Sequence, residues 1–211
     1  MDSYKITFDT WNKLASAYQD KFMDLDLYND TYDIFCQLVN KPQASIFEIG
    51  CGPGNITRYL LAKRPDFKLE AIDIAPSMIE LARTNNPTAR FSVMDCRDID
   101  QLPGPYDAIL CGFCMPYLSK EDCVKLIKDS AALLEDDGIF YFSAIEGDDH
   151  QSGWETDSSE QNKLYVYYHQ EDYLRKALTA HQFDLLYLNR KSYPITTAAS
   201  SSHMIFIARK K

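Results

Sequence analysis

The chain has 211 residues, 45% of them apolar, and a formal net charge of −9. This length and composition predict one domain, or a domain with a small cap, and a full hydrophobic core. The acidic balance argues against a nucleic-acid partner, because phosphate neutralisation requires basic patches. No apolar run approaches the roughly 18 residues of a membrane span, so no membrane partner is predicted either.

The first five residues, M-D-S-Y-K, lack a basic region followed by an apolar one, so no secretory signal is predicted. The six cysteines are dispersed and form no framework, which predicts reduced thiols and a cytoplasmic location. Cys111 and Cys114 have the C-x-x-C spacing of a thiol metal or redox site. Because Cys111 is expected inside a strand and no second such pair is present, no metal site is predicted.

Two amphipathic helices are predicted ahead of the first strand. The apolar face of the first carries Trp11, Leu14, Tyr18 and Phe22. The apolar face of the second carries Tyr32, Phe35, Cys36 and Val39. Both helices are expected to pack against the domain that follows.

Residues 45–55, S-I-F-E-I-G-C-G-P-G-N, predict the first βα corner of a doubly wound sheet. A short apolar run around Glu48 leads into glycines at positions 50, 52 and 54, and a helix is expected from Asn55 to Lys63. Glycine permits positive φ and lets a ligand lie against bare backbone, and the N–H groups at the helix start point toward that ligand. A dinucleotide fingerprint would require a glycine at position 55.

From residue 45 onward strands alternate with helices, which predicts a mostly parallel sheet with right-handed crossovers. The strands expected after the first are Lys68 to Ile74, Ala89 to Met94, Tyr106 to Gly112 and Ile139 to Ile145. Pro76 suits the first turn of one helix. Ser119 and Asp122 form the capping box of the next helix, and Gly138 is expected to end it.

The C-terminal part is predicted to contain a helix and a terminal hairpin. The helix runs from Glu171 to His181, and the two strands from Phe183 to Asn189 and from His203 to Arg209. Their Ser/Thr-rich connection, residues 192–202, favours a hairpin that makes the last strand antiparallel. Residues 147–163 are polar and show no period, so a long loop is expected there, either a lid or disordered. A short extended segment follows it, from Leu164 to Tyr168.

Four features together resemble the class I S-adenosylmethionine-dependent methyltransferases: Glu48 with the three alternate glycines, Asp73, Asp95 and the terminal hairpin. The resemblance covers about residues 45–211, and within the family it is nearest to the small-molecule, quinone-biosynthesis group. It implies an α/β, doubly wound, seven-stranded mixed sheet. This Rossmann-like sheet has its last strand antiparallel, helices on both faces and an N-terminal helical extension.

The resemblance also implies S-adenosylmethionine as cofactor, a small-molecule methyl acceptor and a division of the chain. Residues 1–44 would form a helical lid and residues 45–211 the S-adenosylmethionine-binding domain. The W-x-x-x-A-x-x-Y pattern at Trp11, Ala15 and Tyr18 resembles the family's lid helix. The amino-group methylating branch carries N/D-P-P-Y/F after the fourth strand. This chain has Gly112-Phe113-Cys114-Met115 there, which argues against methylation of base amines or glutamine side chains.

The same resemblance assigns contacts with the cofactor. Glu48, Gly50 and Gly52 would surround its methionine part, Asp73 its ribose hydroxyls and Asp95 its adenine amino group. Met78 is equally consistent with core packing, and Asp95 with a cap on the following turn. The predicted cofactor-binding residues are Tyr18, Glu48, Gly50, Cys51, Gly52, Gly54, Asp73, Ile74, Met78, Asp95, Cys96, Gly112 and Phe113.

Displacement at a sulfonium has an excellent leaving group, so the protein has mainly to align donor and acceptor and to exclude water. No nucleophile motif is therefore expected, and none is found. A general base helps only where the acceptor must lose a proton. The candidates for that role, each also explained by a structural or exposed position, are Tyr18, Tyr117, Glu146, His150, Tyr168 and His169.

Two alternatives remain open. A nicotinamide-dependent oxidoreductase of Rossmann type is disfavoured by Asn55 and by the terminal hairpin. A non-catalytic S-adenosylmethionine-binding module is not excluded, because the chemistry requires no signature side chain. The acceptor, the atom methylated and the oligomeric state are not specified by the sequence.

Overall fold

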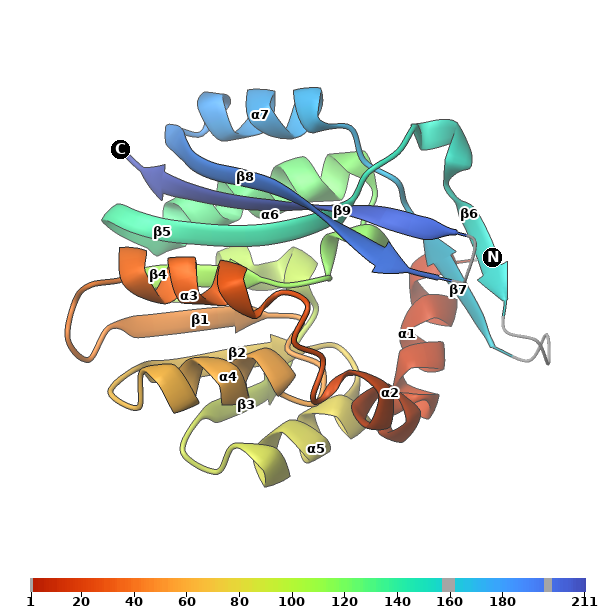
Figure 1. Cartoon of the computed structure of the whole chain (residues 1–211), viewed down its shortest axis with the longest axis horizontal. Helices are drawn as coiled ribbons and strands as arrows, with labels where there is room; N and C mark the ends of the chain where they lie inside the picture. The colour runs from red at the N-terminus through yellow and green to blue at the C-terminus, as the bar shows by residue number, and fades with distance from the viewer. Residues whose placement is uncertain (1, 157–161, 196–198) are drawn as a thin grey trace.

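The computed structural model describes residues 2–156, 162–195 and 199–211. It contains a seven-stranded sheet in the order β3-β2-β1-β4-β5-β9-β8 (Figure 1). The strands are β1 Ser45–Ile49, β2 Lys68–Asp73, β3 Arg90–Val93, β4 Tyr106–Cys111, β5 Leu134–Ile145, β8 Phe183–Pro194 and β9 Ser200–Lys210. The pairs from β3 to β5 are parallel, whereas β9 is antiparallel to both of its neighbours. The predicted doubly wound mixed sheet is confirmed.

Helices cover both faces of the sheet, as predicted. One face is covered by α3 Asn29–Leu38, α4 Asn55–Lys63 and α5 Pro76–Asn85. The other is covered by α6 Lys120–Leu133 and α7 Glu171–Ala180 (Figure 1). Each layer has its own hydrophobic cluster, so the central strands read as nearly continuous apolar runs.

Two short helices, α1 Ser3–Lys13 and α2 Ala15–Phe22, precede this domain. The predicted apolar stripe is present, with Trp11 edge-on to Tyr18 at 5.2 Å between ring centroids, but the helix breaks at Leu14. Thr10 donates a hydrogen bond to the carbonyl of Lys163 at 2.9 Å, which ties α1 to a distant segment. Figure 1 places α1 and α2 at the end of the sheet toward which the parallel strands point.

The prediction of a loop without regular structure over residues 147–163 is wrong for the part that the structure describes. A short 3₁₀ helix, η3 Asp149–Gln151, is followed by an antiparallel hairpin of β6 Gly153–Thr156 and β7 Lys163–Val166. Residues 157–161 of the predicted loop lie outside the described residues. The strands of this hairpin are held by each other and by α1, contacts that no local period reveals. The extended segment predicted from Leu164 overlaps β7.

Gly138 does not end the helix that begins at Ser119. The helix stops at Leu133, because Leu134 turns to an extended conformation and pairs with Tyr106. Gly138 therefore lies inside β5, at an irregularity before Ile139 pairs with Ala108. The terminal hairpin is likewise longer than predicted, so that much of the expected connection over residues 192–202 is strand, and residues 196–198 lie outside the described part.

Among the helices that the structure describes, none has the length and apolar character required to cross a membrane.

Candidate functional site

The turn between β1 and α4 is built on glycines in the left-handed region. Gly52 has a φ of 54°, and a Cβ atom there would have the Tyr18 ring as its neighbour, 3.5 Å away. Gly54 faces the C-terminal end of α5, since a Cβ atom there would lie 2.4 Å from Nδ2 of Asn86. Gly52 thus leaves backbone open toward Tyr18, whereas Gly54 allows close packing of α4 against α5.

Asp73 stands at the end of β2 and holds the same turn from the other side. Its carboxylate accepts hydrogen bonds from the N–H groups of Gly52 and Ala75, each at 2.9 Å. Burial raises the pKa of Asp73 above its ordinary value, and the two N–H groups partly offset that effect. A carboxylate has about four lone-pair positions, so these two bonds leave capacity for a ligand.

Glu48 is a buried acid in the centre of β1, with an exposed fraction of 1%. The Thr57 hydroxyl donates to its Oε2 atom, while Oε1 has no hydrogen-bond partner among the described residues. Burial raises the pKa of Glu48 to about 8. A buried acceptor without a partner is costly and requires an explanation, and a cationic ligand group would provide one.

Asp95 caps the 3₁₀ helix η1 Cys96–Gln101, accepting from the N–H of Arg97 at 2.9 Å. The Arg97 guanidinium also binds this carboxylate, with Nη2 2.6 Å from Oδ2, and lies over the Tyr4 ring at 4.2 Å. Partial burial works against ionisation of Asp95, but Arg97 outweighs it and lowers the pKa of the carboxyl. The cap is therefore present, and the adenine contact stays a prediction.

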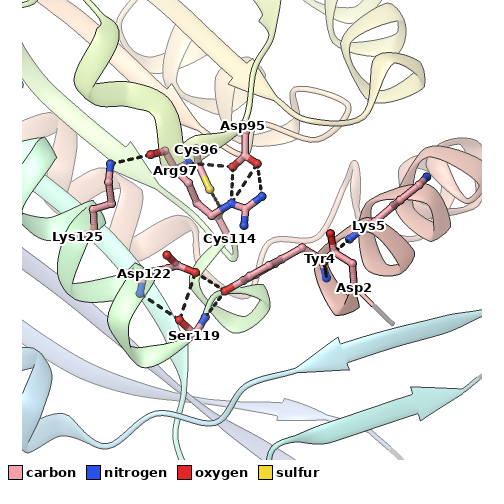
Figure 2. Close-up of polar contacts among 10 residues, drawn as sticks. All are labelled: Asp2, Tyr4, Lys5, Asp95, Cys96, Arg97, Cys114, Ser119, Asp122 and Lys125. Atoms are coloured by element: carbon pink, nitrogen blue, oxygen red, sulfur yellow. Dashed lines mark hydrogen bonds and ion pairs between the residues drawn. The ribbon is translucent and has the colours of Figure 1, made fainter.

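Tyr4 connects α1 to Arg97, the partner of Asp95, and to the start of α6 (Figure 2). Its hydroxyl donates to Asp122 and accepts from the N–H of Ser119 at 2.9 Å, at the start of α6. Because Arg97 packs on the same ring, α1, η1 and α6 form one polar junction beside Asp95.

Around the turn lies a cavity of about 80 Å³, which we call the first cavity. The predicted site residues that line it are Tyr18, Gly50, Gly52, Asp73, Ile74, Met78, Asp95, Cys96, Gly112, Phe113 and Tyr117. Cys114, which follows the fourth predicted strand and was expected near the site, lines it as well, and the lining residues that the prediction missed are Phe8, Trp11, Met94 and Leu118. The apolar face of the N-terminal helix was the signal for Trp11. Met94 is the last residue of a predicted strand, whereas Phe8 and Leu118 had no such signal.

Several predicted site residues lie outside this lining. Cys51 and Glu48 are buried beneath the turn. His169 is buried, with Nε2 3.0 Å from the Met115 carbonyl oxygen and Nδ1 against the Tyr173 hydroxyl. His150 lies exposed in η3.

The cysteines that the structure describes are free, and two of them meet at the first cavity. The Sγ atoms of Cys96 and Cys114 are 3.6 Å apart. Within the described residues, no group of three or more side chains is arranged to hold a metal ion.

A second cavity of about 300 Å³ adjoins the first. The two share Trp11, Tyr18, Phe113 and Tyr117 in their linings. Phe113 adopts a left-handed backbone with a φ of 61°, and its N–H donates to the Ser143 hydroxyl at 2.7 Å. Such strain in a non-glycine residue concentrates at functional sites.

The second cavity is lined largely by aromatic side chains, and it includes His203 of β9. Sequence reasoning missed His203, because only the sheet topology brings the last strand beside residues from the N-terminal helices. Four of the predicted site candidates, Tyr18, Phe113, Tyr117 and Tyr168, do line this cavity.

Residues 46–138 match the model of the family described as "Methyltransferase domain". This part of the chain is therefore similar to a methyltransferase domain. It is 32% identical over 110 residues to the malonyl-[acyl-carrier protein] O-methyltransferase of Acetivibrio thermocellus, covering 51% of this chain and 38% of that protein. It is 41% identical over 59 residues to the trans-aconitate 2-methyltransferase of Rhizobium meliloti, covering 28% and 23%. The matches thus span less than half the length of these curated relatives.

The fold of the chain is also similar to solved structures over its whole length. The magnesium protoporphyrin IX methyltransferase of Synechocystis PCC 6803, solved with bound SAH, gives a TM-score of 0.76 at 17% identity and covers 100% of both chains. The 1,6-didemethyltoxoflavin-N1-methyltransferase of Burkholderia thailandensis gives 0.70 at 22% identity, covering 100% of this chain and 91% of that one. These likenesses confirm the class I methyltransferase fold that the sequence predicts.

Proposed function

We propose that this protein transfers a methyl group from S-adenosylmethionine to a small-molecule acceptor. The observation that carries the proposal is the pair of acids around the glycine turn. Asp73 faces the first cavity with spare acceptor capacity, and Glu48 keeps one buried oxygen without a partner. The cofactor offers ribose hydroxyls to the first and an ammonium group to the second, so one ligand would satisfy both.

S-adenosylmethionine supplies an activated methyl group on a sulfonium, and the residues here would hold and orient it. Gly50 and Gly52 would let it lie against the backbone, and Asp73 would bind the ribose as a charge-assisted acceptor. Asp95 would accept a hydrogen bond from the adenine amino group, and its remaining lone pairs would still accept the hydrogen bonds from Arg97. Phe113 and Tyr117, which line both cavities, would exclude water between donor and acceptor.

We further propose that the helices α1 and α2, within the N-terminal extension of residues 1–44, act as a lid on the domain formed by residues 45–211. The first cavity holds about 80 Å³, below the roughly 300–1,000 Å³ usual for sites of drug-sized ligands. Trp11 and Tyr18 close it on the side of α1 and α2. Entry of a molecule as large as S-adenosylmethionine therefore requires these two rings to move.

Calorimetric titration of the whole chain with S-adenosylmethionine, S-adenosylhomocysteine and NAD⁺ tests the cofactor. Binding of the first two is expected, and binding of NAD⁺ alone would overturn the proposal in favour of an oxidoreductase. Incubation with methyl-labelled S-adenosylmethionine and a metabolite extract tests the transfer. Cofactor binding without label in any acceptor would instead support a non-catalytic binding module.

A further inference from the structure

The walls of the second cavity are aromatic rings that pack against one another. Trp11 lies edge-on to Tyr117 at 5.5 Å, and Phe113 packs on Tyr28 at 4.5 Å, both between ring centroids. Tyr18 packs on Phe22 at 4.5 Å along another wall. Aromatic walls of this kind favour a flat, apolar ligand, because rings stack or meet edge-on over large areas.

Charge is nearly absent from this lining. Among its described residues the charged side chains are Lys21 and Glu155, which are exposed and of opposite sign. An anionic ligand would lose its hydration here without gaining an arginine or a second cation as a partner, which is unfavourable. The cavity therefore suits an uncharged molecule, unlike a polycarboxylate such as trans-aconitate.

One polar group stands out within the apolar walls. His203 has an exposed fraction of 7%, and its Nδ1 atom lies 2.7 Å from the hydroxyl oxygen of Tyr28. The imidazole is stacked on the Tyr193 ring, with centroids 5.3 Å apart and planes 9° from parallel. No described residue is hydrogen-bonded to Nε2, so this nitrogen is available to a ligand.

The surroundings keep the His203 ring neutral. Burial lowers the pKa of His203 to about 4. The titratable groups that face it are Tyr28, Tyr193 and, opposite it on β8, Lys191, whose ammonium is paired with Asp30 at 2.5 Å. A neutral imidazole with one nitrogen engaged offers the other as a single hydrogen-bonding position.

We propose that the second cavity binds the methyl acceptor as an uncharged, planar aromatic or heteroaromatic molecule whose hydroxyl group hydrogen-bonds to Nε2 of His203. The role of this ligand as methyl acceptor rests on the proposed function, whereas the chemical class of the ligand follows from the cavity itself. A volume of about 300 Å³ suits one or two fused rings. Because His203 packs on Phe113 at 5.5 Å, the bound hydroxyl lies at the end that borders the first cavity.

Equilibrium dialysis of the whole chain with three probes tests the ligand class, with and without S-adenosylhomocysteine. The probes are 1-naphthol, naphthalene and 1-naphthoate, which share a ring system and differ in hydroxyl and charge. We expect 1-naphthol to bind about fivefold to tenfold more tightly than naphthalene, the effect of one hydrogen bond. We expect 1-naphthoate to bind more weakly than 1-naphthol. Tightest binding of 1-naphthoate, or equal binding of 1-naphthol and naphthalene, would overturn the proposal without any variant.

Two variants then locate the hydrogen bond. His203→Phe keeps a flat ring in the stack and should lower the affinity for 1-naphthol to that for naphthalene, leaving naphthalene unchanged. His181→Phe, the same exchange at the end of α7 outside the cavity, should leave both affinities unchanged. Equal weakening of both probes by His203→Phe would mean a packing role only, and no weakening would place the ligand elsewhere.

The outcome is separable from that of the proposed function. Naphthol binding without S-adenosylmethionine binding would remove the methyl-transfer proposal and leave the ligand class standing. Binding of S-adenosylmethionine without the expected order of probe affinities would overturn the ligand class and leave the methyl-transfer proposal standing.

Discussion

The first and second cavities share four side chains but are built from different parts of the chain. The first is formed around a glycine turn and acids at strand ends, within short stretches of sequence such as residues 45–54 and 73–78. The second collects aromatic rings from the N-terminal helices and β8 and an imidazole from β9, while the β6–β7 hairpin adds Glu155 and Leu164. If the proposals hold, the backbone and carboxylates of the first cavity bind the cofactor. The aromatic walls of the second cavity can then differ between proteins, and so select another acceptor, without any change in the turn.

The largest effect is expected from filling the glycine turn. Gly52→Val places a β-branched side chain at positive φ, beside the Tyr18 ring. Overpacking of about 3 kcal/mol would weaken S-adenosylmethionine binding about a hundredfold, while 1-naphthol binding in the second cavity stays the same. Titration of both ligands measures this.

Gly153→Val in β6 is the control, since nothing lies within 4 Å of a Cβ atom there. It should change neither affinity. Wild-type affinity of Gly52→Val for S-adenosylmethionine would place the donor outside the first cavity.

Removing the ribose partner should have the next largest effect. Asp73→Ala loses charge-assisted hydrogen bonds worth roughly 1.5–3 kcal/mol each, so the Kd for S-adenosylmethionine should rise at least about tenfold. Calorimetry gives the Kd, and Asp9→Ala, an exposed acid on α1, serves as the matched control. An unchanged Kd in Asp73→Ala contradicts the ribose assignment.

A proton should be released when the cofactor's ammonium group meets Glu48. At pH 6.5 the free protein holds Glu48 protonated, because its pKa is raised to about 8. An adjacent cation favours the carboxylate, so binding lowers this pKa and releases close to one proton per site. Calorimetry in two buffers of different ionisation enthalpy measures the release. Glu48→Gln should abolish it, and an equal release in this variant would exclude Glu48 as the source.

The smallest effect is expected in the lid. Hydrogen exchange of the amides in α1 and α2 should slow when S-adenosylmethionine or S-adenosylhomocysteine binds, because Trp11 and Tyr18 close on the ligand. Deletion of residues 1–26 should leave a folded domain with impaired cofactor binding. Amides in α7, on the far layer, serve as the internal control. Unchanged protection in α1 and α2 would reduce these helices to a packing role.

Local signals predicted much of the parallel half of the molecule. The helix expected from Asn55 to Lys63 has these bounds in the structure, because a glycine in the left-handed region sets its start and a lysine lies in its last turn. Gly138 shows the limit of such signals. It resembles a helix end, but pairing of Leu134 with Tyr106 stops the helix earlier, and pairing partners are not written in local sequence.

By itself, the sequence determined the alternation of strands and helices in the main sheet, the glycine turn and the acids that follow the strands, because periodicity and turn chemistry act over a few residues. Only the tertiary structure decided that Glu48 keeps an oxygen without a partner and that Arg97 lies between Asp95 and Tyr4. The same holds for His203, which stands among aromatic rings from distant segments. These features depend on burial and on contacts between residues far apart in the chain. Such contacts form only when the strands pair in the order of the folded sheet and the helices pack on both of its faces.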